Sequence, residues 1–188
     1  MKKILFSLFV FFGIAGFGFT SDGNLIPEGS FEILNAAGNP EGWKLPDPNW
    51  YKNFGGKVRI INEEGDNFLQ IESDGMDKLL RASFKVTIPD NVARLRLSYR
   101  IRADVRDVAS NEDKKGVGVQ VARWWGNNEK EEAKWGGADW VTASTGGWVD
   151  KEFEFDVPAG MTTLRIDIGI RNASAIADFN DIQLVPVN

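Results

Sequence analysis

The sequence predicts an all-β protein, an antiparallel β-sandwich. Three observations point to this class: apolar and polar residues alternate in at least seven short runs, no run shows a helical period of useful length, and Gly, Pro and Asp separate the runs. Alternation of period two gives a strand one apolar and one polar face. Two such sheets bury their apolar faces against each other, so the core lies between them.

The first expected strands form a hairpin, in which the runs 58–61 and 68–71 flank a turn at 63–67. Five further runs alternate in the same way, and their apolar members are expected to face the core. These runs lie at 80–88, 95–102, 117–122, 152–157 and 164–171.

The last expected strand changes phase along its length. Ala177 and Phe179 are apolar at odd positions, whereas Ile182 and Leu184 are apolar at even ones. Because a strand changes its buried parity through an extra residue, the sequence predicts a β-bulge at Asn180-Asp181. Such a bulge would redirect two oxygen-bearing side chains.

Residues 1–20 read as a cleaved secretory signal peptide, followed by one domain over 21–188. Met1-Lys2-Lys3 precedes an apolar run from Ile4 to Ile14, and small residues follow it. This run is too short to span a bilayer, which needs ~20 apolar residues, and no comparable run follows. The mature protein is therefore expected to be secreted or periplasmic, with no membrane as partner.

Composition excludes several functions. The sequence has no Cys and no His, which removes thiol nucleophiles, Ser-His dyads and the usual His or Cys zinc sites. The formal net charge is −5, and loss of Lys2 and Lys3 with the signal peptide takes it to −7. An acidic balance argues against nucleic acid or an anionic membrane surface as partner.

Two long connections interrupt the strand pattern, at 35–56 and 126–147. Loops of this length in a compact domain are usually functional or disordered, and their tryptophans argue against disorder. Trp50 and Tyr51 in the first loop, and Trp135 and Trp140 in the second, are therefore candidates for ligand contact. The alternative for each is that the ring pins its own loop to the sandwich.

Several segments together resemble jelly-roll carbohydrate-binding modules of the family 4, 9 and 22 type, which belong to the galactose-binding-like sandwiches. The resemblance rests on the opening segment 24–32, the Gly42-Trp43 pair, Thr145-Gly146-Gly147-Trp148 with the strand after it, and the closing segment 179–184. It implies a jelly-roll topology, sugar bound on a sheet face or a loop-lined edge, and burial of Trp43 and Trp148.

The resemblance also implies a structural calcium that joins the two ends of the chain. Its ligands would be Glu32 and Asp181, with Asn180 as a third where such modules usually carry an acid. Calcium takes six to eight oxygen ligands, which carboxylates, amides and backbone carbonyls supply. The alternative is that Glu32 and Asp181 are solvated charges at strand ends.

The parity of the run 117–121 predicts which member of the Trp124-Trp125 pair binds ligand. Adjacent residues of a strand point to opposite faces, so Trp125 should continue the buried set and Trp124 should point outward. An exposed indole offers a flat apolar platform to a sugar ring. Gln120 shares the outward parity and is the amide candidate on that surface.

Arginines form a further outward set. It comprises Arg96, Arg100, Arg102, Arg165 and Arg171. Guanidinium groups pair with carboxylates and sulfates, so an acidic polysaccharide is one reading. The favoured reading is a solvated face on which these arginines pair with Asp and Glu of the same protein.

The function predicted from these features is non-catalytic binding of a polysaccharide or oligosaccharide. A separate glycoside-active enzyme or a surface protein is the partner that such a module would accompany. One alternative is an adhesion or structural module that binds a protein through its exposed tryptophan. A small polysaccharide-active enzyme is disfavoured, because the sequence isolates no pair of carboxylates and offers no His base.

Overall fold

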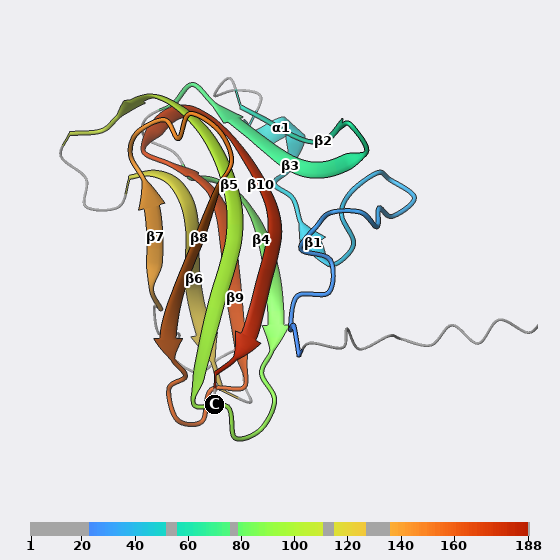
Figure 1. Ribbon diagram of the computed structural model, residues 1–188, viewed down its shortest axis with the longest axis vertical. Helices are drawn as coiled ribbons and strands as arrows, with labels where there is room; N and C mark the ends of the chain where they lie inside the picture. The colour runs from blue at the N-terminus through green and yellow to red at the C-terminus, as the bar shows by residue number, and fades with distance from the viewer. Residues whose placement is uncertain (1–22, 52–55, 76–78, 111–114, 127–135, 188) are drawn as a thin grey trace, which may run out of the picture.

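The computed structural model describes residues 23–51, 56–75, 79–110, 115–126 and 136–187, with the side chains of Trp50 and Arg123 left aside. Within these ranges ten strands form two five-stranded antiparallel sheets, which confirms the expected sandwich (Figure 1). The expected signal peptide lies outside the described residues.

The first sheet, called the β9 sheet, has the order β1-β4-β9-β6-β7. Its strands are β1 (Trp43–Lys44), β4 (Leu79–Thr87), β9 (Thr163–Arg171), β6 (Gly116–Trp125) and β7 (Ala138–Val141). The second, called the β10 sheet, has the order β2-β3-β10-β5-β8 and lies in front in Figure 1. Its strands are β2 (Lys57–Glu63), β3 (Asp66–Ser73), β10 (Ala173–Pro186), β5 (Arg94–Val108) and β8 (Val149–Asp156).

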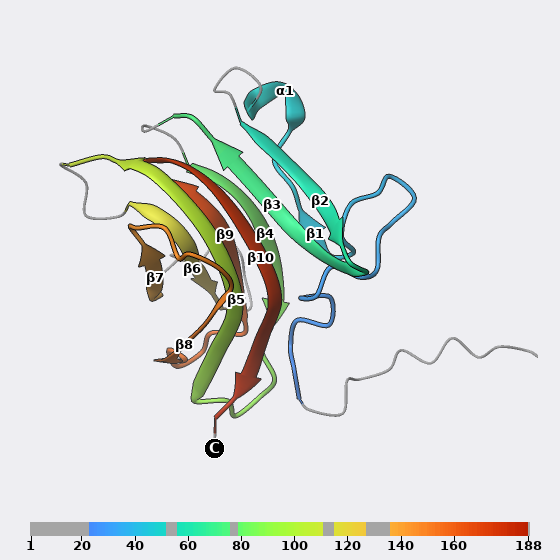
Figure 2. The same cartoon turned by 45° about the horizontal axis from the view of Figure 1, so that its top comes forward.

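The two long connections contain short elements that the sequence pattern did not predict. β1 and the helix α1 (Pro48–Tyr51) lie in the first, and β7 lies in the second. Figure 2 shows α1 beyond the end of β2 and the bend that both sheets follow along their strands. In the part of the chain that the structure describes, no helix is long and apolar enough to cross a membrane.

The hairpin of β2 and β3 is tighter than expected. Glu63 pairs with Asp66, so the turn consists of Glu64 and Gly65 alone. Both turn residues have positive φ, at 56° and 100°. A two-residue turn of this kind matches the right-handed twist of the strands that it joins, and Gly65 adopts it without steric cost.

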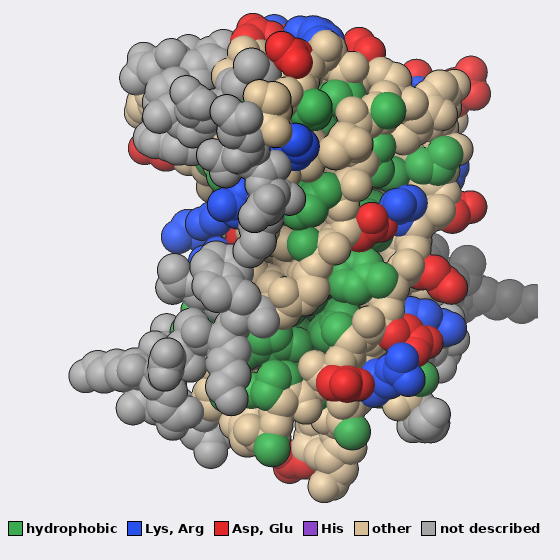
Figure 3. Space-filling view, turned by 90° about the vertical axis from the view of Figure 1, so that its left-hand side faces the viewer, with side chains coloured by type: hydrophobic (Ala, Val, Ile, Leu, Met, Phe, Trp, Pro, Cys, Tyr) green, Lys and Arg blue, Asp and Glu red, His purple; other side chains and the backbone are tan. Residues whose placement is uncertain are grey.

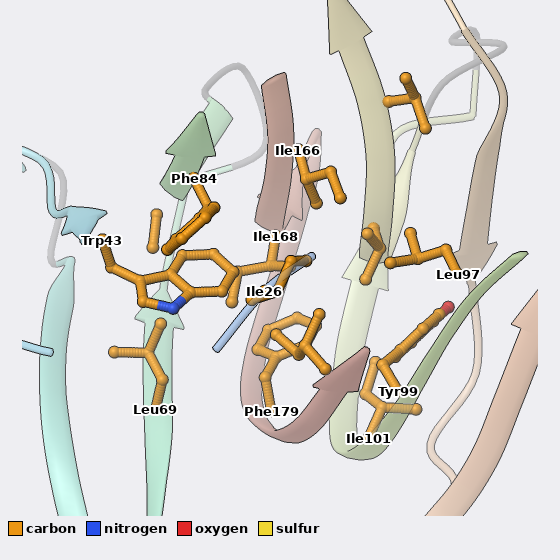
Figure 4. Packing of buried hydrophobic residues seen from close by; sticks show 14 of the residues in the cluster. Ile26, Trp43, Leu69, Phe84, Leu97, Tyr99, Ile101, Ile166, Ile168 and Phe179 are labelled. Atoms are coloured by element: carbon orange, nitrogen blue, oxygen red, sulfur yellow. The ribbon is translucent and has the colours of Figure 1, made fainter. Parts of the chain in front are cut away.

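The apolar positions of the alternating strands fill the space between the sheets, as predicted. Leu80, Ala82 and Val86 of β4 are buried, and so are the apolar residues of β9. Trp43 is buried as expected and packs against Phe84, with ring centroids 5.3 Å apart. Figure 4 shows its indole beside Phe84 and Leu69 in the same cluster as Ile26 and Phe179.

The start of the described chain is bound to the end of β10. Leu25 N donates to Leu184 O at 2.8 Å, and Ile182 N donates to Gly29 O at 3.0 Å. Gly29 lies against the carbonyl of Ile182 so closely that any Cβ there would collide with it. This contact lies at the β-bulge that the sequence predicts for Asn180-Asp181. The bulge is confirmed, because the pairing of β10 with β5 shifts register between Asn180 and Gln183.

Candidate functional site on the outer face of the β9 sheet

The outer face of the β9 sheet, called the β9 face, is built from residues that alternate with the core positions. Cross-strand pairing arranges them in rows, because paired residues of adjacent strands point to the same side. One row runs Lys44, Ser83, Asp167 and Gln120; the next runs Arg81, Gly169, Gly118 and Trp140. Lys85 and Arg165 pair in a third row, on the other side of Ser83 and Asp167.

Asp167 organises the middle of this face. Its side chain is 1% exposed and lies between two cations: Arg81 Nη1 is 3.3 Å from Oδ2, and Arg165 Nε is 2.9 Å from Oδ1. Ser83 Oγ donates to Oδ1 at 2.7 Å, and Gln120 Nε2 donates to Oδ2 at 3.2 Å. A buried carboxylate needs such partners, and each partner is in turn held in one orientation.

A groove of about 530 Å³ opens on this face beside β4. Cations line it from three strands: Lys44, Arg81, Lys85 and Arg165. Leu45, Pro46 and Leu79 form its apolar part, and Asp47 contributes a carboxylate. The groove therefore offers apolar contact and fixed hydrogen-bond donors together, a combination typical of ligand sites.

The predicted orientation of Trp124 and Trp125 is wrong. Trp124 is 1% exposed, belongs to the core and meets Phe155 edge-on, with ring centroids 5.6 Å apart. Trp125 is half-buried, pairs with Thr163 and has Lys85 Nζ 5.9 Å from its ring centroid.

The physical reason is a bulge in β6. Val121 pairs with Ile166 and Arg123 pairs with Arg165, so two steps on β6 match one step on β9 and Ala122 is the extra residue. An extra residue reverses the parity of everything after it. The reversal moves Trp124 from the predicted platform into the core and brings Trp125 to the β9 face.

Trp140 lies on the β9 face, since it pairs with Gly118. Its ring is half-buried, and its indole Nε1 is buried without a hydrogen-bond partner among the described residues. Gly118 and Gly169 have no side chains to fill the same row. A Cβ on Gly118 would collide with the backbone carbonyl of Asp139, so a residue with a side chain does not fit at this position of the row.

The other predicted contact residues have different surroundings. Gln120 faces outward as predicted, yet it is 2% exposed and bound to Asp167 rather than open to solvent. Tyr51 is half-buried in α1 and packs against the core, which is the pinning alternative. Trp135 lies outside the described residues, and so does the side chain of Trp50.

Trp148, predicted to be buried, is half-buried on the outer face of the β10 sheet, called the β10 face. It meets Phe68 edge-on at 5.5 Å between centroids, and the guanidinium carbons of Arg100 and Arg102 lie 5.2 and 5.0 Å from its ring centroid. It therefore packs on a charged sheet surface instead of in the core.

The three residues that the resemblance assigns to calcium have protein partners in the structure. Glu32 accepts hydrogen bonds from the backbone and side-chain amides of Asn67, both at 3.1 Å. Asp181 pairs with Arg100 at 3.2 Å, and Asn180 Oδ1 accepts from the backbone N–H of Asp181. Among the described residues no three acidic side chains converge on a metal position. Calcium thus remains a prediction of the resemblance.

Sequence reasoning missed the centre of the site, Asp167. One signal was available: an aspartate in the middle of a strand is unfavourable unless it has partners, and Arg165 lies on the same face two residues earlier. Arg81, Ser83, Lys44 and Lys85 carry no individual signal. Only the register of β1, β4 and β9 brings them beside Asp167.

No protein-family profile and no curated protein sequence matches the chain. Solved structures do resemble it. A family 4 carbohydrate-binding module has a TM-score of 0.59 at 15% identity, over 86% of this chain and 99% of its own. The family 22 xylan-binding domain of Paenibacillus barcinonensis Xyn10C has a TM-score of 0.52 at 15% identity, over 89% and 97%.

A family 16 carbohydrate-binding module has a TM-score of 0.52 at 18% identity, over 86% of this chain and 99% of its own. In all three cases the whole solved module matches nearly the whole chain. The likeness confirms the jelly-roll fold that the sequence resemblance implied.

Proposed function

We propose that the protein binds a polysaccharide or oligosaccharide on the β9 face and does not cleave it. The observation that carries the proposal is the pair of half-buried tryptophans, Trp125 and Trp140, on one face with a fixed polar cluster between them. Trp125 and the partner of Trp140 are seven residues apart on β6, or roughly 20 Å along an extended strand. This spacing suits a chain of several sugar units. The modules with the same fold are described as carbohydrate-binding.

The chemistry of the face supports binding over catalysis. A glycosidase needs two carboxylates on opposite sides of the scissile bond, one of them able to give up a proton. Asp167 is buried and held by Arg81 and Arg165, and Asp47 is the one other carboxylate among the described residues of the groove. This arrangement favours recognition of hydroxyl and anionic groups over bond cleavage.

Tyr99, which a lyase would need as a base, is not arranged for that role. Burial raises the pKa of Tyr99 far above its usual value, and the neighbouring Asp139 raises it further. Its hydroxyl donates to Asp139 Oδ2 at 3.0 Å. A phenol that stays protonated and donates to a carboxylate cannot take a proton from a substrate.

Export belongs to the same proposal, because a polymer-binding protein meets its ligand outside the cytoplasm. The predicted signal peptide at 1–20 supports this localisation. Co-localisation with an enzyme that acts on the bound polysaccharide would follow from it. N-terminal sequencing of the exported protein would test the cleavage near residue 20.

Affinity electrophoresis against a panel of soluble polysaccharides tests the binding. Stacking a sugar on Trp125 would bury ~60 Å² of apolar surface, worth about 1.5 kcal/mol or roughly tenfold in affinity. Trp125→Ala should therefore reduce the retardation about tenfold. Trp148→Ala is the matched control, since it removes a half-buried indole from the opposite sheet.

Loss of retardation in both variants, or in neither, would contradict the assignment to the β9 face. Trp140→Phe gives a second test, because it keeps an aromatic ring, although a smaller one, and removes the indole N–H. It should weaken binding by less than Trp125→Ala while leaving the melting temperature near that of the native protein. A reducing-sugar assay on every retarding polymer should remain at background.

A further inference from the structure

We propose that the outer edge of β2 pairs with the same edge of a second copy of the chain, which joins the two β10 sheets into one continuous sheet. The proposal goes beyond carbohydrate binding, because β2 belongs to the sheet opposite the β9 face. It rests on the hydrogen-bonding pattern of the β2–β3 hairpin and on the order of charges along β2.

β2 is an edge strand whose second side has no strand partner among the described residues. It stands first in the order β2-β3-β10-β5-β8, and all seven of its residues pair with β3. Figure 2 shows it at the outside of its sheet, beyond β3. A regular strand of this length with an open side is a template for pairing with another strand.

The hairpin determines which backbone groups of β2 face the open side. A two-residue turn closes on a pair that exchanges both N–H···O bonds, here Glu63 and Asp66, and bonded and non-bonded pairs alternate from there. Asn62 and Asn67 form the next, non-bonded pair. Accordingly, Asn67 N donates to the Glu32 carboxylate at 3.1 Å instead of to β2.

The same alternation directs the N–H and C=O groups of Val58, Ile60 and Asn62 away from β3. The side chains of Val58 and Ile60 pack against the core, yet both remain only half-buried. The core side chains of β3, Leu69 and Ile71, are 0% exposed. The edge of β2 thus leaves polar backbone groups and apolar surface for a partner to cover.

One antiparallel register of two β2 strands uses the whole strand. With the two-fold axis at Ile60, Val58 exchanges hydrogen bonds with the partner's Asn62, and Ile60 with the partner's Ile60. Every outward-directed backbone group of the strand then has a partner. A shift of the axis to Ile61 would set Val58 opposite the turn residue Glu64, which lies outside the strand.

Side chains favour the same register. Lys57 lies opposite the partner's Glu63, and Arg59 lies opposite the partner's Ile61. The two-fold axis repeats each pair, so two opposite-charge pairs form, and such cross-strand pairs are stabilising. An axis at Arg59 would instead set two arginines directly opposite each other.

The charges that meet at the interface also have partners within one protomer. Lys57 pairs with Glu72 at 2.9 Å, and Glu63 pairs with Arg102 at 3.0 Å. Lys57 and Glu63 nevertheless remain 58% and 53% exposed. Pairing of two copies therefore extends both contacts into one row of alternating charge, which runs from Glu72 through Lys57 to Glu63 and Arg102 of the partner copy.

The other edge strand of this sheet, β8, does not fit a second copy. Its exposed residues are all acidic: Asp150, Glu152, Glu154 and Asp156. An antiparallel pair of β8 strands with these residues on one face would set like charges opposite each other, which is destabilising. The order of charges therefore selects β2 as the edge for a two-fold contact.

The two-fold axis of an antiparallel strand pair is perpendicular to the sheet, so the β9 sheets of both copies would lie on the same side. Two β9 faces would then meet one polymer surface together, which raises the apparent affinity without a new contact. This consequence rests on the proposed function, whereas the pairing itself does not. A contact of seven residues is small, below ~1,200 Å², so we expect reversible dimerisation at micromolar concentration.

Sedimentation equilibrium of the exported protein without polysaccharide tests the pairing. We expect a shift from monomer to dimer between low and high micromolar concentration. Amide hydrogen exchange at Val58, Ile60 and Asn62 should slow over the same range. A monomer at every concentration up to ~1 mM, or a dimer in which these three amides exchange as fast as in the monomer, would overturn the proposal.

Charge reversal tests the register. Glu63→Lys and Lys57→Glu each turn two opposite-charge pairs into like-charge pairs, so each variant should dimerise about tenfold more weakly or worse. An equimolar mixture of the two should recover the native dissociation constant, because the heterodimer restores both pairs. Arg59→Gln is the matched control on the same face of β2 and should change dimerisation by less than about threefold.

Circular dichroism and thermal melts of each variant establish that it is folded. Recovery in the mixture is a readout that a loss of stability cannot produce. A mixture that dimerises no better than the separate variants would overturn the register, and so would an equal loss in Arg59→Gln. Because polysaccharide is absent throughout, none of these outcomes bears on the proposed carbohydrate binding, which the retardation assay tests separately.

Discussion

Arginine side chains line both outer faces of the sandwich, and their partners differ between the two. On the β10 face each of four arginines pairs with a nearby carboxylate. These pairs join Arg94 to Glu154 and Asp156, Arg100 to Asp150 and Asp181, Arg102 to Glu63 and Asp178, and Arg106 to Asp74. Along the right margin of Figure 3 acidic and basic side chains accordingly alternate.

On the β9 face two arginines share one carboxylate. Arg81 and Arg165 converge on the single buried carboxylate of Asp167, and Lys44 and Lys85 add further positive charge beside them. Each of the four arginines on the β10 face is paired with at least one carboxylate, whereas Arg81 and Arg165 of the β9 face share Asp167, which fixes their orientation beside the groove. The comparison therefore separates a solvated sheet surface from a candidate binding surface on one small domain.

The largest expected effect concerns which tryptophan belongs to the β9 face. Trp124→Ala would empty a buried site against Phe155 and should cost ~3–5 kcal/mol of unfolding free energy. Trp125→Ala removes a half-buried ring and should cost about 1 kcal/mol or less. Urea unfolding of the two variants measures both. Equal losses would mean that the bulge at Ala122 does not reverse the parity of β6.

The strands and their buried faces could be predicted from the sequence because alternation records burial directly. Leu80 to Val86 in β4 and Leu164 to Ile170 in β9 behave as this pattern requires. The bulge in β10 was also visible, since apolar residues change phase on either side of Asn180-Asp181. Local pattern is sufficient where each strand has one buried side.

The bulge in β6 could not be predicted in the same way. Arg123 interrupts the apolar set at odd positions, but apolar residues stand at both parities around it, Ala122 and Trp124 at even positions and Trp125 at an odd one, so the phase beyond Val121 is ambiguous in the sequence. The short β1 and β7 were missed because two- and four-residue strands carry too little alternation. The cluster at Asp167 depends on cross-strand register, which a single sequence does not contain. The sequence pattern therefore places the wrong one of the two tryptophans on the outer face of β6.

An intermediate effect compares the two buried aspartates of the opposite faces. Asp167→Asn would leave Arg81 and Arg165 without their shared counter-charge and should cost ~3 kcal/mol. Asp178→Asn on the β10 face should cost ~1–2 kcal/mol, because Arg102 keeps its second partner, Glu63. Thermal melts at constant pH measure the difference. A larger loss in Asp178→Asn would contradict the view that Asp167, which pairs with two arginines, contributes more to stability than Asp178.

The smallest expected effect comes from an exposed pair on the β10 face, Arg94 and Glu154. Arg94 Nη2 is 2.9 Å from Glu154 Oε2, and the two side chains are 53% and 33% exposed. Water and salt screen such a pair, so Arg94→Gln should cost ~0.5 kcal/mol at low ionic strength and less in 0.5 M salt. Polysaccharide retardation should not change, because Arg94 lies on the opposite sheet from the groove. Reduced retardation in this variant, without a change in stability, would extend the binding surface to the β10 face and remove the distinction between the two faces.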